Sequence, residues 1–194
     1  ERDDEPCVYG TRAPLRSWNP LWANAEVYWA TLKDALHARR WRDKLLVWIK
    51  PPGWRPADVA ERFPKPAFDM ARARYAPPLP RGLTAYGIAQ FALLLLMGVW
   101  FLDMAKRMPA SSLLAYAAFL LFSLTALGVL LEGRRAGTWL EGARLAVTAL
   151  AAVVTGGWFG AASAPPALAP AIVALCLGSA AALATIRLRT RQPA

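Results

Sequence analysis

The chain holds few side chains of the kinds that act as metal ligands or nucleophiles. It has one histidine, His37, and two cysteines, Cys7 and Cys176, among 194 residues. A structural zinc site needs four Cys or His ligands, so these distant residues cannot assemble one. His37 has no Ser or Cys neighbour at a useful spacing, and we interpret it as a solvated helix residue. Because a Gly-rich phosphate loop is also missing, we expect no catalytic and no metal-ligating residue in this chain.

The charged residues that surround these few groups are concentrated in the first part of the chain. Hydrophobic residues make up 56% and charged residues 19% of the sequence, whereas about 25% are charged in typical soluble domains. Residues 1–82 contain 15 of the 23 Lys and Arg and 10 of the 13 Asp and Glu. This division excludes a disordered chain, a disulfide-linked secreted domain and a single water-soluble core. We expect a cytoplasmic or interfacial segment, 1–82, and a membrane domain, 83–194.

Four apolar stretches in the second part are each long enough to cross a bilayer. About 20 helical residues span the hydrocarbon core, and none of the four stretches has an internal charge. A helix in a soluble bundle would keep a polar face, which these stretches lack. The expected transmembrane helices cover residues 83–102, 110–131, 145–162 and 167–186. The expected fold class is therefore all-α, an integral membrane protein with four transmembrane helices.

The basic residues beside these stretches indicate an orientation. Nine Lys and Arg lie on the side that both termini share: three before the first stretch, three between the second and third, and three in the tail. Two lie on the other side. Because Lys and Arg are retained in cytoplasmic loops, we expect both termini in the cytoplasm.

The third stretch contains two glycines at a spacing typical of helix contacts. Gly156 and Gly160 are four residues apart, and small residues at this spacing let two helix backbones approach closely. The pair would form either a dimer face or a contact within the four-helix cluster. We favour the second interpretation and expect a helix-packing role for both glycines.

An amphipathic helix rich in tryptophan is expected near the start of the chain. Asn19-Pro20 is a good helix start, and apolar residues recur at steps of three and four up to residue 38. A shorter helix, 41–49, follows and ends at Pro51-Pro52-Gly53. Six of the nine Trp lie in the first 54 residues. The candidate interface residues are Trp22, Trp29, Leu32, Leu36, Trp48 and Trp54.

Two interpretations of this Trp-rich segment stay open. Trp rings beside Lys and Arg suit the headgroup boundary of an anionic membrane, and packing on a larger protein domain would require the same apolar stripe. Nucleic acid is disfavoured because ten acidic residues are interleaved with the basic ones and no known binding motif appears. We expect the lipid bilayer as a partner and no nucleic acid.

Three features together resemble one enzyme family. They are the segment 8–11 (Val-Tyr-Gly-Thr), the run from Arg42 to Pro56 with its Lys-Pro-Pro-Gly-Trp-Arg-Pro ending, and the apolar stretches from about Thr84. The chain is similar to the C-terminal part of bacterial sterol desaturases of the fatty acid hydroxylase superfamily, especially members similar to alkylglycerol monooxygenase. The resemblance implies a bacterial inner-membrane protein and an O₂-dependent oxidoreductase, which hydroxylates or desaturates a lipid.

The resemblance also implies a di-iron centre that this chain does not contain. Family members hold their iron with H-x-x-x-H and H-x-x-H-H clusters, which would lie upstream of Val8, and His37 matches neither. Glu1–Glu5 is charged and lacks the regions of a signal peptide. We therefore expect a non-catalytic C-terminal membrane portion, inactive alone, with no cofactor and an upstream histidine-rich catalytic domain as partner. The alternative is a free-standing small membrane-anchored interaction protein with no enzymatic role.

Overall fold

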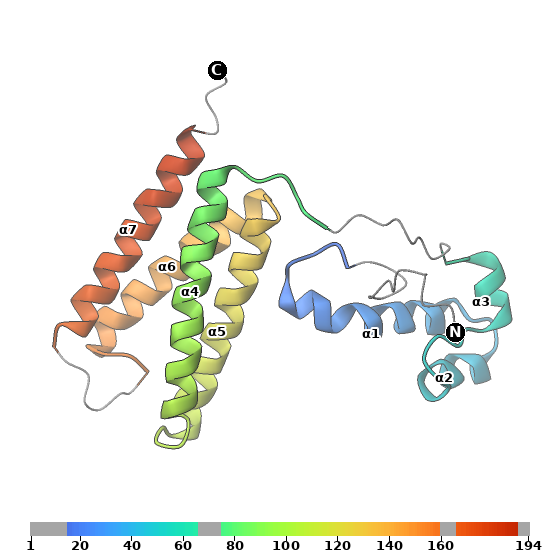
Figure 1. The fold of residues 1–194 in the computed structure, drawn as a ribbon. Helices are drawn as coiled ribbons and strands as arrows, with labels where there is room; N and C mark the ends of the chain where they lie inside the picture. The colour runs from blue at the N-terminus through green and yellow to red at the C-terminus, as the bar shows by residue number, and fades with distance from the viewer. Residues whose placement is uncertain (1–14, 66–74, 160–165, 190–194) are drawn as a thin grey trace, which may run out of the picture. The chain divides into compact units, whose positions relative to one another are not determined.

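The protein is all-helical. The structure, a computed structural model, describes residues 15–65, 75–159 and 166–189 (Figure 1). These residues form seven α-helices and no strand, so the expected all-α fold class is confirmed. The chain divides into two compact units. The N-terminal unit comprises Leu21–Ala76 and the residues before Ser17, and the spanning unit comprises Ser17–Pro20 and the chain from Pro77 onward.

Three helices make up the N-terminal unit: α1 (Pro20–His37), α2 (Trp41–Ile49) and α3 (Ala57–Arg62). α2 ends because Lys50 precedes proline and has extended backbone angles, as the proline ring requires of its predecessor. The chain then turns between Pro51 and Trp54, whose N–H donates to the Pro51 carbonyl over 3.1 Å. Gly53 has a φ of +91°, which the third position of a type II turn demands. This turn directs the chain back toward α3.

Four long helices make up the spanning unit: α4 (Arg81–Met104), α5 (Ala110–Leu131), α6 (Arg135–Thr155) and α7 (Leu168–Arg189). Each is long and apolar enough to cross a membrane. α4 packs on α5, α5 on α6 and α6 on α7, while α4 and α7 touch over a shorter length. The core contains Leu83, Tyr86, Leu94, Leu127, Leu130 and Leu183. In α7 only Cys176 and Leu183 are buried, so most of its apolar surface is available to lipid.

The short segment before α1 is attached to the end of α5. The Ser17 hydroxyl and the Trp18 N–H both donate to Glu132 Oε1, over 2.5 and 2.9 Å. Gly128, one turn before the end of α5, lies directly against the Trp18 carbonyl, and a Cβ there would overlap it. Glycine is therefore required at 128 by close backbone contact.

The third spanning helix differs from the sequence-based prediction. α6 begins at Arg135 and ends at Thr155, whereas the apolar stretch suggested residues 145–162. Gly156 follows α6 in a left-handed conformation, with a φ of +63°, which is the usual conformation at a helix C-terminus. A Cβ on Gly156 would meet no neighbouring atom, so no close helix contact is seen at this glycine, and the packing role of the pair stays a prediction. Gly160 lies outside the described residues.

Several hydroxyl groups within the spanning helices are paired with backbone carbonyls. Thr125, Thr148 and Thr155 donate to the carbonyl four residues earlier, over 2.6–2.8 Å. The Tyr116 hydroxyl donates to the Met97 carbonyl over 2.8 Å and joins α5 to α4. Because hydrocarbon offers no hydrogen-bond partners, these internal bonds make the polar side chains compatible with a bilayer.

Candidate functional site

Arg55 holds the N-terminal unit together. Its Nε and Nη2 donate to the two carboxylate oxygens of Asp34 in α1, each over 2.8 Å, and its Nη1 donates to the Phe63 carbonyl over 2.8 Å. The side chains of Arg55 and Asp34 are only 12% and 14% exposed. Paired parallel N–H···O bonds of this kind are among the strongest in proteins. They connect α1 to the chain on both sides of α3.

A second polar contact joins α3 to the α1–α2 connection. Asp58 Oδ2 accepts the Arg39 N–H over 3.1 Å and Arg62 Nη2 over 3.1 Å, and Arg62 also donates to the His37 carbonyl over 2.6 Å. These bonds, first that from the Arg39 backbone, lower the pKa of the Asp58 carboxyl below its ordinary value. The charged form of Asp58 is therefore the one that stabilises this contact.

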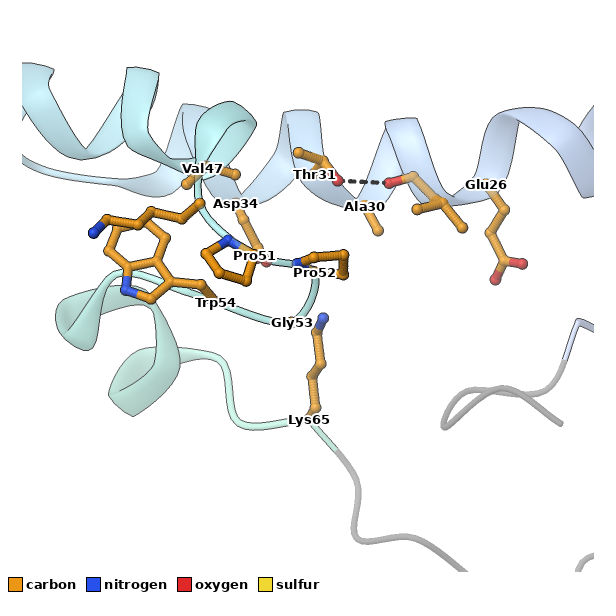
Figure 2. Close-up of a pocket in the computed structure, with 12 residues that line it drawn as sticks. Glu26, Ala30, Thr31, Asp34, Val47, Pro51, Pro52, Gly53, Trp54 and Lys65 are labelled. Carbon is orange, nitrogen blue, oxygen red and sulfur yellow. Dashed lines mark hydrogen bonds between the residues drawn. The ribbon is translucent and has the colours of Figure 1, made fainter. Parts of the chain in front are cut away.

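A pocket of about 250 Å³ lies between α1 and the turn that follows α2 (Figure 2). Ala30, Thr31 and Asp34 line it from α1, and Pro51, Pro52 and Trp54 line it from the turn. In Figure 2 the Lys65 side chain points toward Gly53 at the open edge. Trp54, predicted as an interface residue, thus lies half-buried in this pocket.

The predicted Trp stripe lies on the opposite side of α1. Successive helical residues are rotated by about 100°, so Trp22, Trp29 and Leu36 project away from Val27, Thr31 and Asp34, which line the pocket. Trp22, Trp29 and Leu36 are 40%, 46% and 64% exposed, and Leu32 is half-buried. The turn and its pocket therefore leave this side of α1 uncovered.

The six predicted interface residues do not form one surface. Trp22, Trp29, Leu32 and Leu36 share a side of α1, while Trp54 lines the pocket on the other side. Trp48 lies on α2 and is 49% exposed. Periodicity along α1 predicts one stripe for the first group, but it could not place the two Trp residues that follow. Their role at an interface stays a prediction.

A buried polar network joins α4, α6 and α7 within the spanning unit. Arg144 donates through Nε and Nη2 to the two oxygens of Glu141, over 2.8 and 2.6 Å. Arg144 Nη2 also donates to Gln90 Oε1 over 2.8 Å, and Gln90 Nε2 donates to Ser179 Oγ over 2.8 Å. The Tyr86 hydroxyl donates to Glu141 Oε1 over 2.6 Å. Glu141 is fully buried, and Arg144, Gln90 and Tyr86 are at most 8% exposed.

The sequence did not predict this network, because Glu141 and Arg144 lie outside the expected stretch 145–162. Arg144 is nine residues after the first residue of α6, or about 13 Å along the helix axis at about 1.5 Å per residue. The Glu–Arg spacing of three on one helix is the signal that indicates a pair. Because the two charges cancel and their polar atoms are bonded, the pair can lie inside a spanning bundle, where a lone charge is costly.

The chain is similar in sequence to a known enzyme. It is 26% identical over 148 residues to alkylglycerol monooxygenase of Xenopus tropicalis, an enzyme of the fatty acid hydroxylase family. The chain is a distant homologue of this lipid monooxygenase. The match covers 72% of the chain but only 32% of the enzyme, so the chain spans about a third of the length of that relative. No family model and no solved structure matches the chain.

The residues that the structure describes do not fit the di-iron centre that the family implies. The only histidine, His37, has its Nδ1 2.7 Å from the Lys33 carbonyl, and its ring packs on Phe63. Within residues 15–65, 75–159 and 166–189, no three His, Cys, Asp or Glu side chains are grouped as metal ligands. An iron pair that reacts with O₂ needs several converging imidazole or carboxylate ligands. The described residues therefore do not provide a ligand set for such a centre.

Proposed function

We propose that this chain is the non-catalytic C-terminal membrane portion of a di-iron lipid oxygenase similar to alkylglycerol monooxygenase. The observation that supports this most is the homology to that enzyme over 72% of the chain, together with four helices suited to spanning a membrane. In the proposal, a histidine-rich catalytic domain precedes the chain and performs O₂-dependent hydroxylation or desaturation of a lipid. Helices α4–α7 anchor that domain at the bilayer.

The uncovered side of α1 is the surface that we assign to the catalytic domain. Trp22 and Trp29 leave 40% and 46% of their side chains exposed, although full burial of a large apolar side chain gains about 1.5–3 kcal/mol. The stripe residues themselves are uncharged, and the Lys33 ammonium lies 5.5 Å from the centre of the Trp29 ring at its edge; an apolar, aromatic centre with a charged rim is typical of a protein interface. A partner domain that covers this side of α1 would remove the largest aromatic side chains of the helix from water.

The same proposal assigns the membrane and the orientation. By resemblance, the protein lies in the bacterial inner membrane, and the nine-to-two distribution of basic residues beside the spans favours cytoplasmic termini. In this orientation the N-terminal unit and the catalytic domain share the cytoplasmic face, where a lipid substrate can be reached from the membrane surface.

Complementation tests the proposal. The chain is co-expressed with the separately encoded histidine-rich portion of a complete family member, and monooxygenase activity on the lipid substrate of that member is measured in membranes. We expect the wild-type chain to restore activity. Trp29→Asp should lower it by about tenfold or more, since a charge would enter an apolar contact.

Val27→Asp is the matched control, because Val27 lies on the opposite side of α1 and is 66% exposed. It should keep the wild-type activity within about twofold, as exposed substitutions usually do. Equal losses in the two variants would contradict the assignment of the α1 stripe. If the wild-type chain neither restores activity nor binds the histidine-rich portion, the proposal fails and the free-standing interaction protein becomes the better interpretation.

A further inference from the structure

Helix α2 has an apolar face that no other described residue of its unit covers. Trp41, Leu45, Trp48 and Ile49 are 80%, 66%, 49% and 78% exposed, and no residue of α2 is buried. Their spacing of four, three and one places them within about 100° of the helix circumference. Four large apolar side chains on nine residues form a contiguous patch, here called the α2 face, and such patches mark interaction sites.

Basic side chains border the α2 face on both long edges. At about 100° per residue, Arg42 lies next to Ile49 on one edge and Lys44 next to Trp48 on the other. The Lys44 ammonium lies 5.2 Å from the centre of the Trp41 ring. Asp43, which is the only acid of α2, projects to the opposite side. The α2 face therefore combines a wide apolar surface with a positively charged rim.

The N-terminal unit is tethered to the spanning unit at both of its ends. The chain enters the N-terminal unit from Ser17–Pro20 and leaves it at Pro77, and both segments belong to the spanning unit. Tethering at both ends gives the α2 face a high effective concentration at the membrane. Binding of a soluble partner would instead cost the translational and rotational entropy of that partner. The membrane is thus the partner that needs the least intrinsic affinity.

We propose that the α2 face lies in the headgroup layer of a bilayer that contains anionic lipid. Trp41 and Trp48 take the headgroup level, where amphipathic rings are favoured. Leu45 and Ile49 reach the acyl boundary, as in interfacial helices, and Arg42 and Lys44 bind anionic lipid. This surface is separate from the α1 stripe, and the proposal holds whether or not a catalytic domain is present.

The test uses the full chain, reconstituted without any other protein, in liposomes of phosphatidylcholine alone or of equal parts phosphatidylcholine and phosphatidylglycerol. Both native cysteines are replaced by alanine, and single cysteines at Leu45 or Ala60 carry a fluorophore that aqueous iodide quenches. Ala60, an exposed residue of α3, is the control. We expect iodide to quench the Leu45 label severalfold less than the Ala60 label in the anionic liposomes. One Lys or Arg near such a surface contributes about fivefold to binding, so this shielding should weaken in phosphatidylcholine alone.

The charge dependence separates a lipid surface from a protein partner. Raising the salt from about 0.15 to about 1 M shortens the Debye length from about 8 to about 3 Å, so it should expose the Leu45 label to iodide. The double variant Arg42→Gln, Lys44→Gln should expose the label in the same way. Equal quenching of the two labels in anionic liposomes would overturn the proposal. So would shielding of Leu45 that appears only after a protein extract is added, or that is the same in both lipids and at both salt concentrations.

Discussion

Removing Arg144 should destabilise the spanning unit far more than removing an exposed arginine. Arg144→Met deletes three hydrogen bonds of 2.6–2.8 Å and leaves the buried Glu141 carboxylate with the Tyr86 hydroxyl as its donor. Breaking a buried ion pair in this way costs about 3–5 kcal/mol, which is roughly 6–20 °C in Tm at 2–4 °C per kcal/mol for a chain of this size.

Thermal unfolding of the detergent-solubilised chain, followed by far-UV circular dichroism, measures this loss. Arg134→Met is the matched control, because the Arg134 side chain is 70% exposed and 3.5 Å from Glu132. An exposed pair of this kind contributes about 0–1 kcal/mol. The double variant Glu141→Leu, Arg144→Met should recover much of the stability, since it leaves no unpaired charge.

Two results would refute this reasoning. If Arg144→Met and Arg134→Met lower Tm equally, the Glu141–Arg144 pair does not stabilise the bundle. If the double variant is less stable than Arg144→Met alone, the apolar replacements fail for reasons other than charge, and the loss is one of packing.

Three further predictions concern the N-terminal unit and the topology. Arg55→Met should destabilise the N-terminal unit by about 1.5–3 kcal/mol, as expected for lost hydrogen bonds to a charged group. Arg39→Met is the control and should have little effect, because Arg39 binds Asp58 through its backbone N–H. Urea unfolding followed by Trp fluorescence compares the stabilities of the two variants. The pKa of Asp58 lies below its ordinary 3.8 in the folded state, so the folded chain binds fewer protons than the unfolded chain near that pH. The stabilisation by the Asp58 carboxylate is therefore complete above about pH 4 and is lost as the pH falls through the folded pKa. Asp58→Asn should remove this part of the acid sensitivity, and an unchanged acid transition would contradict the role of Asp58. A reporter fused after Ala194 that is active only when exported should stay inactive in cells, and an active reporter would reverse the proposed orientation.

Much of the helical architecture could be predicted from local sequence alone. The expected stretch 110–131 coincides with α5, and the expected helix 41–49 coincides with α2. These helices begin or end beside prolines, and prolines act through the local backbone. Both ends of α4 and both ends of α7 lie within three residues of the expected positions, because charged residues and prolines delimit the apolar runs.

The ends of α6 and the distribution of Trp residues could not be predicted in this way. Glu141 and Arg144 appear as a boundary in a hydropathy profile, and only their contacts with Tyr86 and Gln90 of another helix make them internal. Likewise, Trp54 is apolar and close in sequence to the α1 stripe, but the turn at Gly53 places it in the pocket. Both features depend on contacts between elements, which periodicity within one element does not report.

The central claim is that this chain works as the membrane portion of a di-iron lipid oxygenase. The most direct measurement is to capture the native protein from its own membranes with an antibody against this chain, and to quantify iron and identify every co-purifying polypeptide by mass spectrometry. The account predicts a histidine-cluster domain, either in the same polypeptide or tightly bound, with iron at about two ions per chain, as a di-iron centre held by imidazole ligands requires. Native protein that is recovered intact with neither iron nor a histidine-cluster polypeptide would contradict it.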